Sequence, residues 1–221
     1  MRKNVLKQYC GYLTTNQVAE GMSAAAANAS RLAADARLLF EAERYPSAAS
    51  LAVLSLEESG KVSILRQLVS AQSDLDVKDV WSRYRRHTEK NYLALLPDLV
   101  AEGARTLREF ARCFLGESIS ERIAFDAVKQ LGFYTDCCGD AHWSIPTEVI
   151  TKDLASLLLS LATALSSNEC GATAKEMELW AGYMHAGLNR ENLLKWAAAM
   201  VNAGLKPPDY VEKMRRFTEG L

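Results

Sequence analysis

Residues 48–61 read Ala-Ala-Ser-Leu-Ala-Val-Leu-Ser-Leu-Glu-Glu-Ser-Gly-Lys, and this alanine- and leucine-rich stretch decides the fold class. The stretch contains no proline and is built from strong helix formers. When successive residues are turned by about 100°, Leu54, Leu65 and Leu68 fall on one apolar face. Pro46 suits the first turn of such a helix, because the amide hydrogens of that turn have no partner within the helix. We therefore predict a helix from about residue 46 to about residue 71.

Glu57, Glu58 and Lys61 fall on this apolar face, whereas Ser55 and Ser63 fall on the opposite, expected solvent side. Because an isolated buried ion is very costly, these charges must be paired. Their spacing of three and four residues allows either glutamate to meet Lys61. One ammonium group cannot neutralise two carboxylates, so we predict a second basic group from another segment. The cluster is either a structural network or a functional site, since burial and like charges also shift pKa values at functional sites.

The rest of the chain is also dominated by helical patterns. Thr14 and Gln17 form a capping-box pattern, which begins a helix that is expected to end near residue 44. Ser73 or Asp74 caps a third helix, expected over residues 76–95. Further helices are predicted over residues 98–115, 118–131, 151–166, 172–186, 190–202 and 208–218. Residues 133–144 read as a loop or a short extended excursion, so the sequence predicts an all-α fold.

Cations line one edge of the third predicted helix. Arg83, His87 and Lys90 form this stripe, and Asn91 lies on the apolar face of the same helix. Arginine offers a planar fork to a phosphate and lysine a point charge, while histidine moves protons near neutral pH. These are the groups that metal-independent RNA cleavage needs. The alternative is a basic helix edge with one partly packed histidine. The same stripe is the expected source of the second basic group for the Glu57 cluster.

Composition limits where the chain acts. The 26 lysines and arginines nearly balance 27 aspartates and glutamates, so no overall field draws the chain to nucleic acid or to an anionic membrane. RNA would have to bind at a local basic patch. The five cysteines form no Cys-x-x-Cys pair, which favours a reducing cytoplasm without disulfides. The most apolar run, residues 154–165, is too short to span a bilayer, and we expect no contact with a membrane.

The segment before Pro146 carries four residue types that bind metals, Cys137, Cys138, Asp140 and His142. Adjacent cysteines cannot easily share one tetrahedral ion, so we expect no metal site. No glycine-rich phosphate loop or His-Glu-x-x-His pattern occurs, and no cofactor is expected. Tyr134 and Asp136 are expected to lock this loop to the helices, or to join the site around His87.

Three segments, in this order along the chain, resemble the AbiV-type abortive-infection proteins of the HEPN superfamily. Residues 48–61 resemble the Glu-Glu-x-Gly-Lys helix of that family, and residues 85–90 resemble its His-x-x-Lys segment. Residues 129–136 resemble its Lys-x-x-x-x-Tyr-x-Asp segment, which leads to a Trp-x-x-Pro step at Trp143 and Pro146. Together they span roughly residues 15 to 165. The remaining residues towards the C-terminus match no motif of the family.

The resemblance implies an antiparallel HEPN-like helical bundle, which we expect over residues 1–170, with residues 171–221 as a helical extension packed on it. It also implies a homodimer and a role in bacterial phage defence, in which the infected cell is shut down. Many HEPN relatives are metal-independent ribonucleases with an arginine, four to six residues, then a histidine. Arg83, Arg85 and Arg86 all lie too close before His87 for that pattern. The resemblance therefore extends the catalytic role only to His87, with Arg83, Arg86 and Lys90 as phosphate contacts.

Two classes of function remain open, and the sequence leaves it uncertain whether the protein is an enzyme. The first is a ribonuclease effector that cleaves host or phage RNA after a phage-encoded protein triggers it. The second is a non-catalytic helical protein that binds a phage or translation component, or an inactive partner of a toxin–antitoxin-like pair. His87 separates the two classes, because an enzyme needs it for chemistry and a binding module only for folding.

Overall fold

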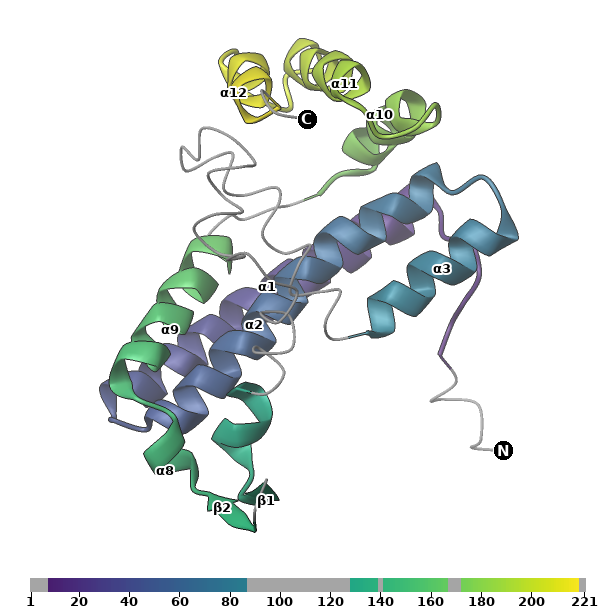
Figure 1. The fold of residues 1–221 in the computed structure, drawn as a ribbon. Helices are drawn as coiled ribbons and strands as arrows, with labels where there is room; N and C mark the ends of the chain where they lie inside the picture. The colour runs from purple at the N-terminus through teal and green to yellow at the C-terminus, as the bar shows by residue number, and fades with distance from the viewer. Residues whose placement is uncertain (1–7, 87–127, 139–140, 167–171, 219–221) are drawn as a thin grey trace.

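The fold is helical over most of the chain that the computed structural model describes, which comprises residues 8–86, 128–138, 141–166 and 172–218 (Figure 1). Two long helices, α1 (Thr15–Glu41) and α2 (Tyr45–Gln67), lie antiparallel and side by side. Helix α9 (Lys152–Ser166) packs against both, and α3 (Asp74–Arg85) folds back beside α2. The prediction of an all-α fold is confirmed.

Helix α1 begins where the sequence predicts. The Thr14 hydroxyl accepts a hydrogen bond from the Gln17 amide at 3.2 Å, and the Gln17 side chain accepts one from the Thr14 amide at 3.0 Å. The helix ends at Glu41, slightly before the predicted end, because Glu43 adopts a left-handed φ of 60°. Pro46 lies in the first turn of α2, as expected. This tight connection returns α2 directly along α1.

Buried alanines line the contact between the two long helices, namely Ala29, Ala33 and Ala36 of α1 and Ala49 and Ala52 of α2. Because a methyl group is small, the two backbones approach closely. The hydroxyl of Ser55 in α2 therefore reaches the carbonyl oxygen of Ala29 in α1 at 2.8 Å. Helix α9 adds larger side chains to this core, among them Leu158 and Leu165.

Helix α2 is buried on nearly its whole circumference, and the expectation that its serine side faces solvent is wrong. Ser55 is completely buried and Ser59 is 8% exposed, because other helices pack on this side as well as on the leucine side. The helix also ends at Gln67, and a short 3-10 helix, η1 (Leu68–Ser70), completes the predicted span. Polar side chains of a helix enclosed in this way meet protein groups more than solvent, as Ser55 does at the Ala29 carbonyl.

Helix α3 has the predicted start but an earlier end. Ser73 and Asp76 form a capping box, and Trp81 is buried on the predicted apolar face. The expected continuation to residue 95 is wrong, because Arg86 already has an extended backbone with ψ of 122°. Tyr84 is the last residue of α3 that packs against the core, so the helix loses its tertiary support at this point.

The segment between the unplaced residues and α9 is short and partly extended. Residues 128–133 are helical, and β1 (Asp136–Cys138) then pairs with β2 (His142–Ser144) in an antiparallel hairpin. This hairpin is the extended excursion that the sequence predicts over residues 133–144. A single helical turn, α8 (Pro146–Val149), leads into α9. Two hydrogen bonds fasten α9 along α1, one from Ser30 to the carbonyl of Ser166 at 2.7 Å and one from Arg37 to Thr163 at 3.3 Å.

Helices α10 (Ala174–Met184), α11 (Arg190–Asn202) and α12 (Tyr210–Phe217) stand at one end of the long helices (Figure 1). They share a core that includes Trp180 and Trp196, whose rings meet edge to face at 5.1 Å. Met177 of α10 is buried in the core that α1, α2 and α3 share. Gly187 and Gly204 follow α10 and α11 with left-handed φ angles, as expected for helix stops.

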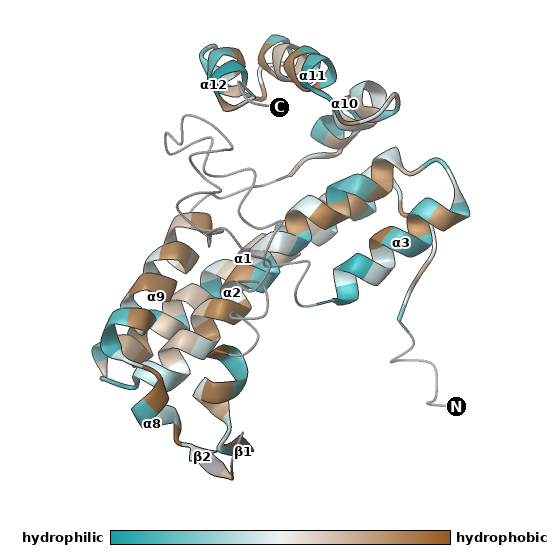
Figure 2. Ribbon diagram, in the orientation of Figure 1, coloured by the Kyte–Doolittle hydropathy of each residue, from teal (hydrophilic) through white to brown (hydrophobic). Residues whose placement is uncertain are grey.

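Helices α3 and α9 differ in the hydropathy of their residues. Helix α3 carries many hydrophilic residues, whereas α9 is mostly hydrophobic, and its described residues after Asp153 include no charged side chain (Figure 2). None of the helices in the described ranges is long and apolar enough to cross a membrane.

The helical turn at residues 128–133 lies tightly against the start of α2. A Cβ atom placed on Gly132 would lie 2.2 Å from the Ser50 hydroxyl and 2.7 Å from the Pro46 carbonyl oxygen. Both separations are far below van der Waals contact, and the carbonyl belongs to the backbone of a buried helix. Only glycine therefore permits this approach.

We expect Gly132→Ala to destabilise the protein by about 1–3 kcal/mol, the usual cost of overpacking a closed contact. The matched control is Gly182→Ala, because Gly182 lies inside α10 with nothing within 4 Å of an added Cβ. Alanine is the better helix former, so the control should gain about 0.5–1 kcal/mol. Urea unfolding of the two variants measures both effects. Equal stabilities would show that the turn at residues 128–133 is not packed as described.

Candidate functional site

The charged cluster of α2 lies where two of the three segments noted in the sequence, residues 48–61 and 129–136, come together. Glu57 is 3% exposed, and its Oε1 atom lies 2.9 Å from the Nζ atom of Lys129. Lys129 belongs to the helical turn before the hairpin and is 7% exposed. The ammonium of Lys61 lies over the ring of Tyr84, near the end of α3, at 5.4 Å from its centroid. Charged side chains of α2 thus contact the segment around Lys129 and the last turn of α3.

Lys129 is the second basic group that the two glutamates require. The predicted source, the third helix from His87 onward, lies outside the described residues, so that expectation stays a prediction. Lys129 lies 72 residues further along the chain, and sequence reasoning did not include it among the site residues. One signal was present, because Lys129 is the first residue of the third segment that resembles the AbiV family.

The backbone around Lys129 is also fixed to α2. The Ser50 hydroxyl lies 3.3 Å from the Lys129 carbonyl oxygen and 3.0 Å from that of Pro46, one turn earlier in α2. Together with the close approach of Gly132, this contact sets the height of Lys129 along the helix. Lys129 is thus held at its backbone by Ser50 and at its ammonium group by Glu57.

Glu58 forms a second, less buried pair. Its carboxylate hydrogen bonds to the ammonium of Lys61, and each side chain is 18% exposed. The prediction that Glu57 or Glu58 hydrogen bonds to Lys61 is confirmed. The position of Lys61 over Tyr84 adds a cation–π contact, which favours the charged lysine and ties α2 to α3.

The arginines at the end of α3 are held to different degrees. Arg83 donates to Asp79 at 2.9 Å and to Gln67 of α2 at 2.7 Å, so its guanidinium is fixed by the protein. Arg86 is exposed and donates to Ser82 at 3.3 Å, which leaves most of its fork turned to solvent. Cations at this position also suit the negative end of the helix dipole. Arg86 is therefore better placed than Arg83 to contact a ligand.

The predicted edge of Arg83, His87 and Lys90 does not exist as one helical stripe. Helix α3 ends at Arg85, and the extended backbone of Arg86 breaks the four-residue spacing between Arg83 and His87. His87, Lys90 and Asn91 lie outside the described residues. The structure therefore places the arginine-rich end of α3 beside the α2 cluster, immediately before His87 in the chain.

Tyr134 and Asp136 belong to the hairpin instead of the cluster. The Tyr134 side chain is 62% exposed, and its ring meets that of Phe133 at 6.4 Å. Asp136 is exposed, and its carboxylate accepts a hydrogen bond from the Cys137 amide at 2.8 Å. The hairpin is fixed through buried Ser144, whose hydroxyl bonds to the Asp136 backbone. The expectation that Tyr134 and Asp136 lock the loop through their side chains is therefore wrong.

One protein-family model matches more than half of the chain. The family model HEPN_AbiV, described as AbiV, matches residues 17–167, a span from the first turn of α1 to the end of α9. The chain belongs to the AbiV family. No curated protein and no solved structure matches it. In this AbiV protein the matched span contains all three segments noted in the sequence, whereas α10, α11 and α12 lie beyond it.

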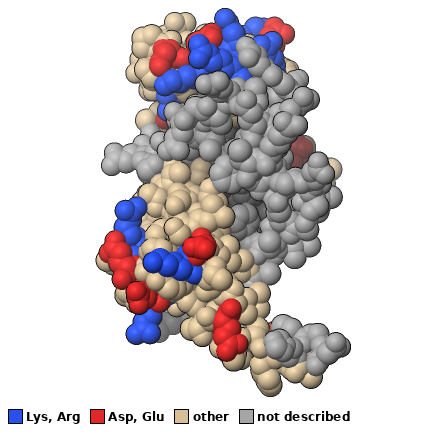
Figure 3. Space-filling model, turned by 60° about the vertical axis from the view of Figure 1, so that its left-hand side comes forward, with Lys and Arg blue, Asp and Glu red and all other residues tan. Residues whose placement is uncertain are grey.

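A second group of cations lies on the C-terminal helices of the AbiV protein, where blue side chains gather at the top of Figure 3. Most of these cations pair with acids on their own helix. Lys195 contacts Glu191, and this hydrogen bond lowers the pKa of the Glu191 carboxyl. Arg215 and Arg216 both contact Glu212. The paired acids offset the positive field, so this surface is a weaker candidate for phosphate than the end of α3.

Metal ligands do not gather in the described parts of this AbiV protein. There, no group of three or more histidine, cysteine, aspartate or glutamate side chains is close enough to hold an ion. Cys137 is exposed in β1. The side chains of Cys138, Asp140 and His142, the other candidates in this loop, lie outside the described set. The described side chains of the candidate site are therefore those of α2, of the end of α3 and of Lys129.

Breaking the buried pair should cost far more than breaking the half-exposed one. Lys129→Met removes the ammonium group that pairs with the buried Glu57 carboxylate, so we expect a loss of about 3–5 kcal/mol in unfolding free energy. Lys61→Met is the matched control, because the exposed fractions of Glu58 and Lys61 are larger and solvent can replace the contact. The combined Glu57→Gln and Lys129→Met variant should recover part of the loss. Chemical denaturation measures all three, and equal losses for the two lysines would contradict the burial.

Proposed function

We propose that this AbiV protein is an anti-phage effector that binds RNA at the arginine-rich end of α3 and cleaves it without a metal ion. The main support is that α2 meets the segment around Lys129 at the buried Glu57–Lys129 pair and meets the last turn of α3 through Lys61 and Tyr84. These contacts fix the end of α3 on the bundle. His87 follows Arg86 directly, so its backbone starts from that place.

The proposed reaction is attack of a ribose 2′-hydroxyl on the adjacent phosphorus, which expels the 5′-oxygen of the next nucleotide. His87 takes the proton of the attacking hydroxyl or gives one to the leaving oxygen. Arg86 and Lys90 stabilise the negative charge that gathers on the phosphate oxygens. The products carry a 2′,3′-cyclic phosphate and a 5′-hydroxyl. Arg83 acts as a positioning residue in this scheme, because Asp79 and Gln67 already hold its guanidinium.

The net charge of the chain is close to zero, so a single copy offers few cations to RNA. This supports a homodimer as the form that acts on RNA. Two copies that meet through α2 and α3 would bring two sets of arginines into one groove, since a two-fold interface is self-complementary. A phage-encoded protein is the proposed trigger and the bacterial cytoplasm the proposed location. Light scattering at micromolar concentration tests the dimer, and a monomer there would rule out the shared groove.

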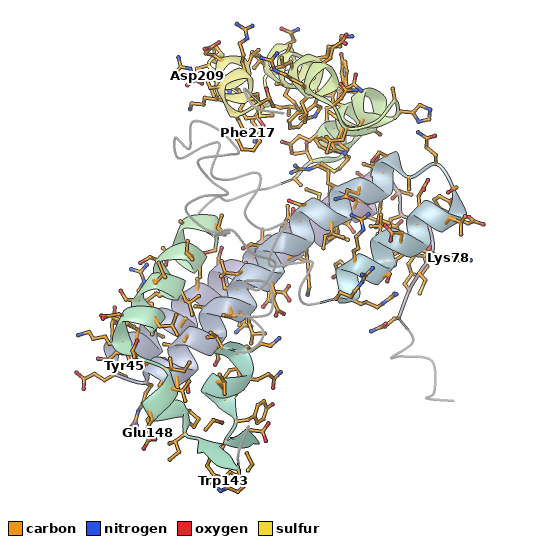
Figure 4. The ribbon with its side chains drawn as sticks, in the orientation of Figure 1. Tyr45, Lys78, Trp143, Glu148, Asp209 and Phe217 are labelled. Atoms are coloured by element: carbon orange, nitrogen blue, oxygen red, sulfur yellow. The ribbon has the colours of Figure 1, made fainter. Side chains whose placement is uncertain are left out.

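A non-catalytic interaction protein is the second candidate, and the hairpin end of the molecule favours it. Trp143 and Tyr134 are each 62% exposed there, and Trp143 extends from the hairpin (Figure 4). Exposed tryptophan and tyrosine are frequent anchors of protein interfaces. A phage protein or a translation component would bind at this end. Co-sedimentation with purified ribosomes tests this candidate, and Trp143→Ser should reduce the bound fraction if the hairpin carries it.

Incubation of the purified protein with total RNA decides between the two candidates. Cleavage should survive EDTA and leave a cyclic phosphate end. His87→Ala should lower the rate by a factor on the order of 10²–10⁴ while its helical circular dichroism stays unchanged. The matched control is His185→Ala, because His185 is exposed at the end of α10, on a different core.

Loss of cleavage in EDTA would contradict the metal-independent mechanism, and so would full activity in a folded His87→Ala protein. If the wild-type protein cuts no RNA, the interaction-protein function becomes the better one. In that case His87→Ala should affect only folding or ribosome binding.

A further inference from the structure

An extended segment before α1 lies along α3 and is tied to it at three places. We call residues 8–13 the strap; it is part of the purple segment beside α3 in Figure 1. Near the start of α3, Tyr12 hydrogen bonds to the Asp74 carboxylate, which raises the pKa of the Tyr12 hydroxyl. Further along, the Trp81 indole donates to the Gly11 carbonyl at 2.9 Å. The strap therefore runs antiparallel to α3.

The third tie involves an arginine of the candidate site. The Nη2 atom of Arg85 donates to the Tyr9 carbonyl oxygen at 2.7 Å and lies 3.2 Å from the Cys10 sulfur. The same guanidinium lies over the Trp81 ring at 5.6 Å. Arg85 is thus turned towards the strap, whereas its neighbour Arg86 is exposed. Of the three arginines at the end of α3, Arg83 is held by Asp79 and Gln67 and Arg85 by the strap.

We propose that the strap is an autoinhibitory contact that withholds Arg85 from RNA phosphate. This inference rests on the proposed RNA function and names the regulation of that same site. A backbone carbonyl is a neutral acceptor, whereas a phosphate offers two charged oxygens to the guanidinium fork. RNA phosphate therefore competes with the Tyr9 carbonyl for Arg85. Displacement of the strap converts the site from one exposed arginine to two adjacent ones.

The strap is built so that it can leave without unfolding the protein. Tyr9 is 59% exposed and Tyr12 is 53% exposed, so few apolar contacts hold either of them. The Tyr9 ring touches Trp81 edge to face at 6.2 Å, and its hydroxyl donates to the Tyr12 carbonyl at 2.8 Å. Leu13 packs against the core and anchors the strap next to α1. Segments with few buried contacts open locally at a small fraction of the global stability.

Gly11 offers a substitution that disturbs the strap and leaves α3 untouched. A Cβ atom at this position would lie 2.6 Å from the Tyr9 hydroxyl oxygen, so Gly11→Ala must displace the Tyr9 ring. A second variant that lacks residues 1–10 removes the Tyr9 carbonyl itself. Arg85→Gln, combined with each, shows whether any change in binding acts through Arg85.

Binding of a fluorescent single-stranded RNA oligonucleotide is measured by anisotropy at several salt concentrations. We expect Gly11→Ala and the shortened chain to bind about fivefold or more tightly than the full chain. The slope of log affinity against log salt should steepen by about 0.7, the value for one more phosphate contact on a single strand. Arg85→Gln should abolish this gain in both backgrounds and change the full chain little. Thermal unfolding verifies that each variant is folded.

The outcomes separate this inference from the proposed function. If the full chain binds RNA and Arg86→Gln weakens it, but neither strap variant changes affinity, the strap is not inhibitory and the RNA function stands. If Arg85→Gln weakens RNA binding by the full chain as much as it weakens RNA binding by the strap variants, Arg85 is not withheld, and the inference is wrong. If no form binds RNA, the proposed function and the inference both fail.

Discussion

The pairing of Glu57 with Lys129 is the interaction on which the rest of the structure depends. A carboxylate buried inside a helix bundle is tolerated only beside a cation, and that cation comes from a segment 72 residues away. The contact therefore fixes the register of the helical turn before the hairpin against α2. Gly132 and Ser50 complete this fit, one by leaving room and the other by bonding to the Lys129 backbone. The position of the hairpin, and of α9 after it, follows from this anchored turn.

The same enclosure of α2 gives the site its framework. Because other elements cover nearly every side of this helix, several of its polar side chains bond to neighbouring segments. Lys61 reaches Tyr84 at the end of α3, and Glu57 reaches Lys129. The family match spans these contacts and stops before the C-terminal helices, so the AbiV fold and the site framework coincide. Chemistry at His87 would use this framework as its support.

Local signals in the sequence were sufficient for the helix starts and for the all-α class. The capping boxes at Thr14 and Ser73, and the glycines after α10 and α11, act within a few residues and are visible without a fold. The partner of Glu57 could not be found in this way, because a long-range ion pair leaves no periodic trace. The end of α3 was missed for a related reason. No glycine or proline follows Arg86 closely, and the helix stops where its contact with the core ends.

The alanine contact between α1 and α2 limits which substitutions this protein can accept. Most single-nucleotide changes in an alanine codon give valine, threonine, serine, proline, glycine, aspartate or glutamate. At Ala33 or Ala52, a branched side chain separates the two backbones, proline or glycine weakens the helix, and an acid is left without a cation. The largest contact in the core is therefore the one where random change has the fewest acceptable outcomes. Substitutions that leave stability unchanged are expected instead at exposed positions, such as those on the outer side of α3.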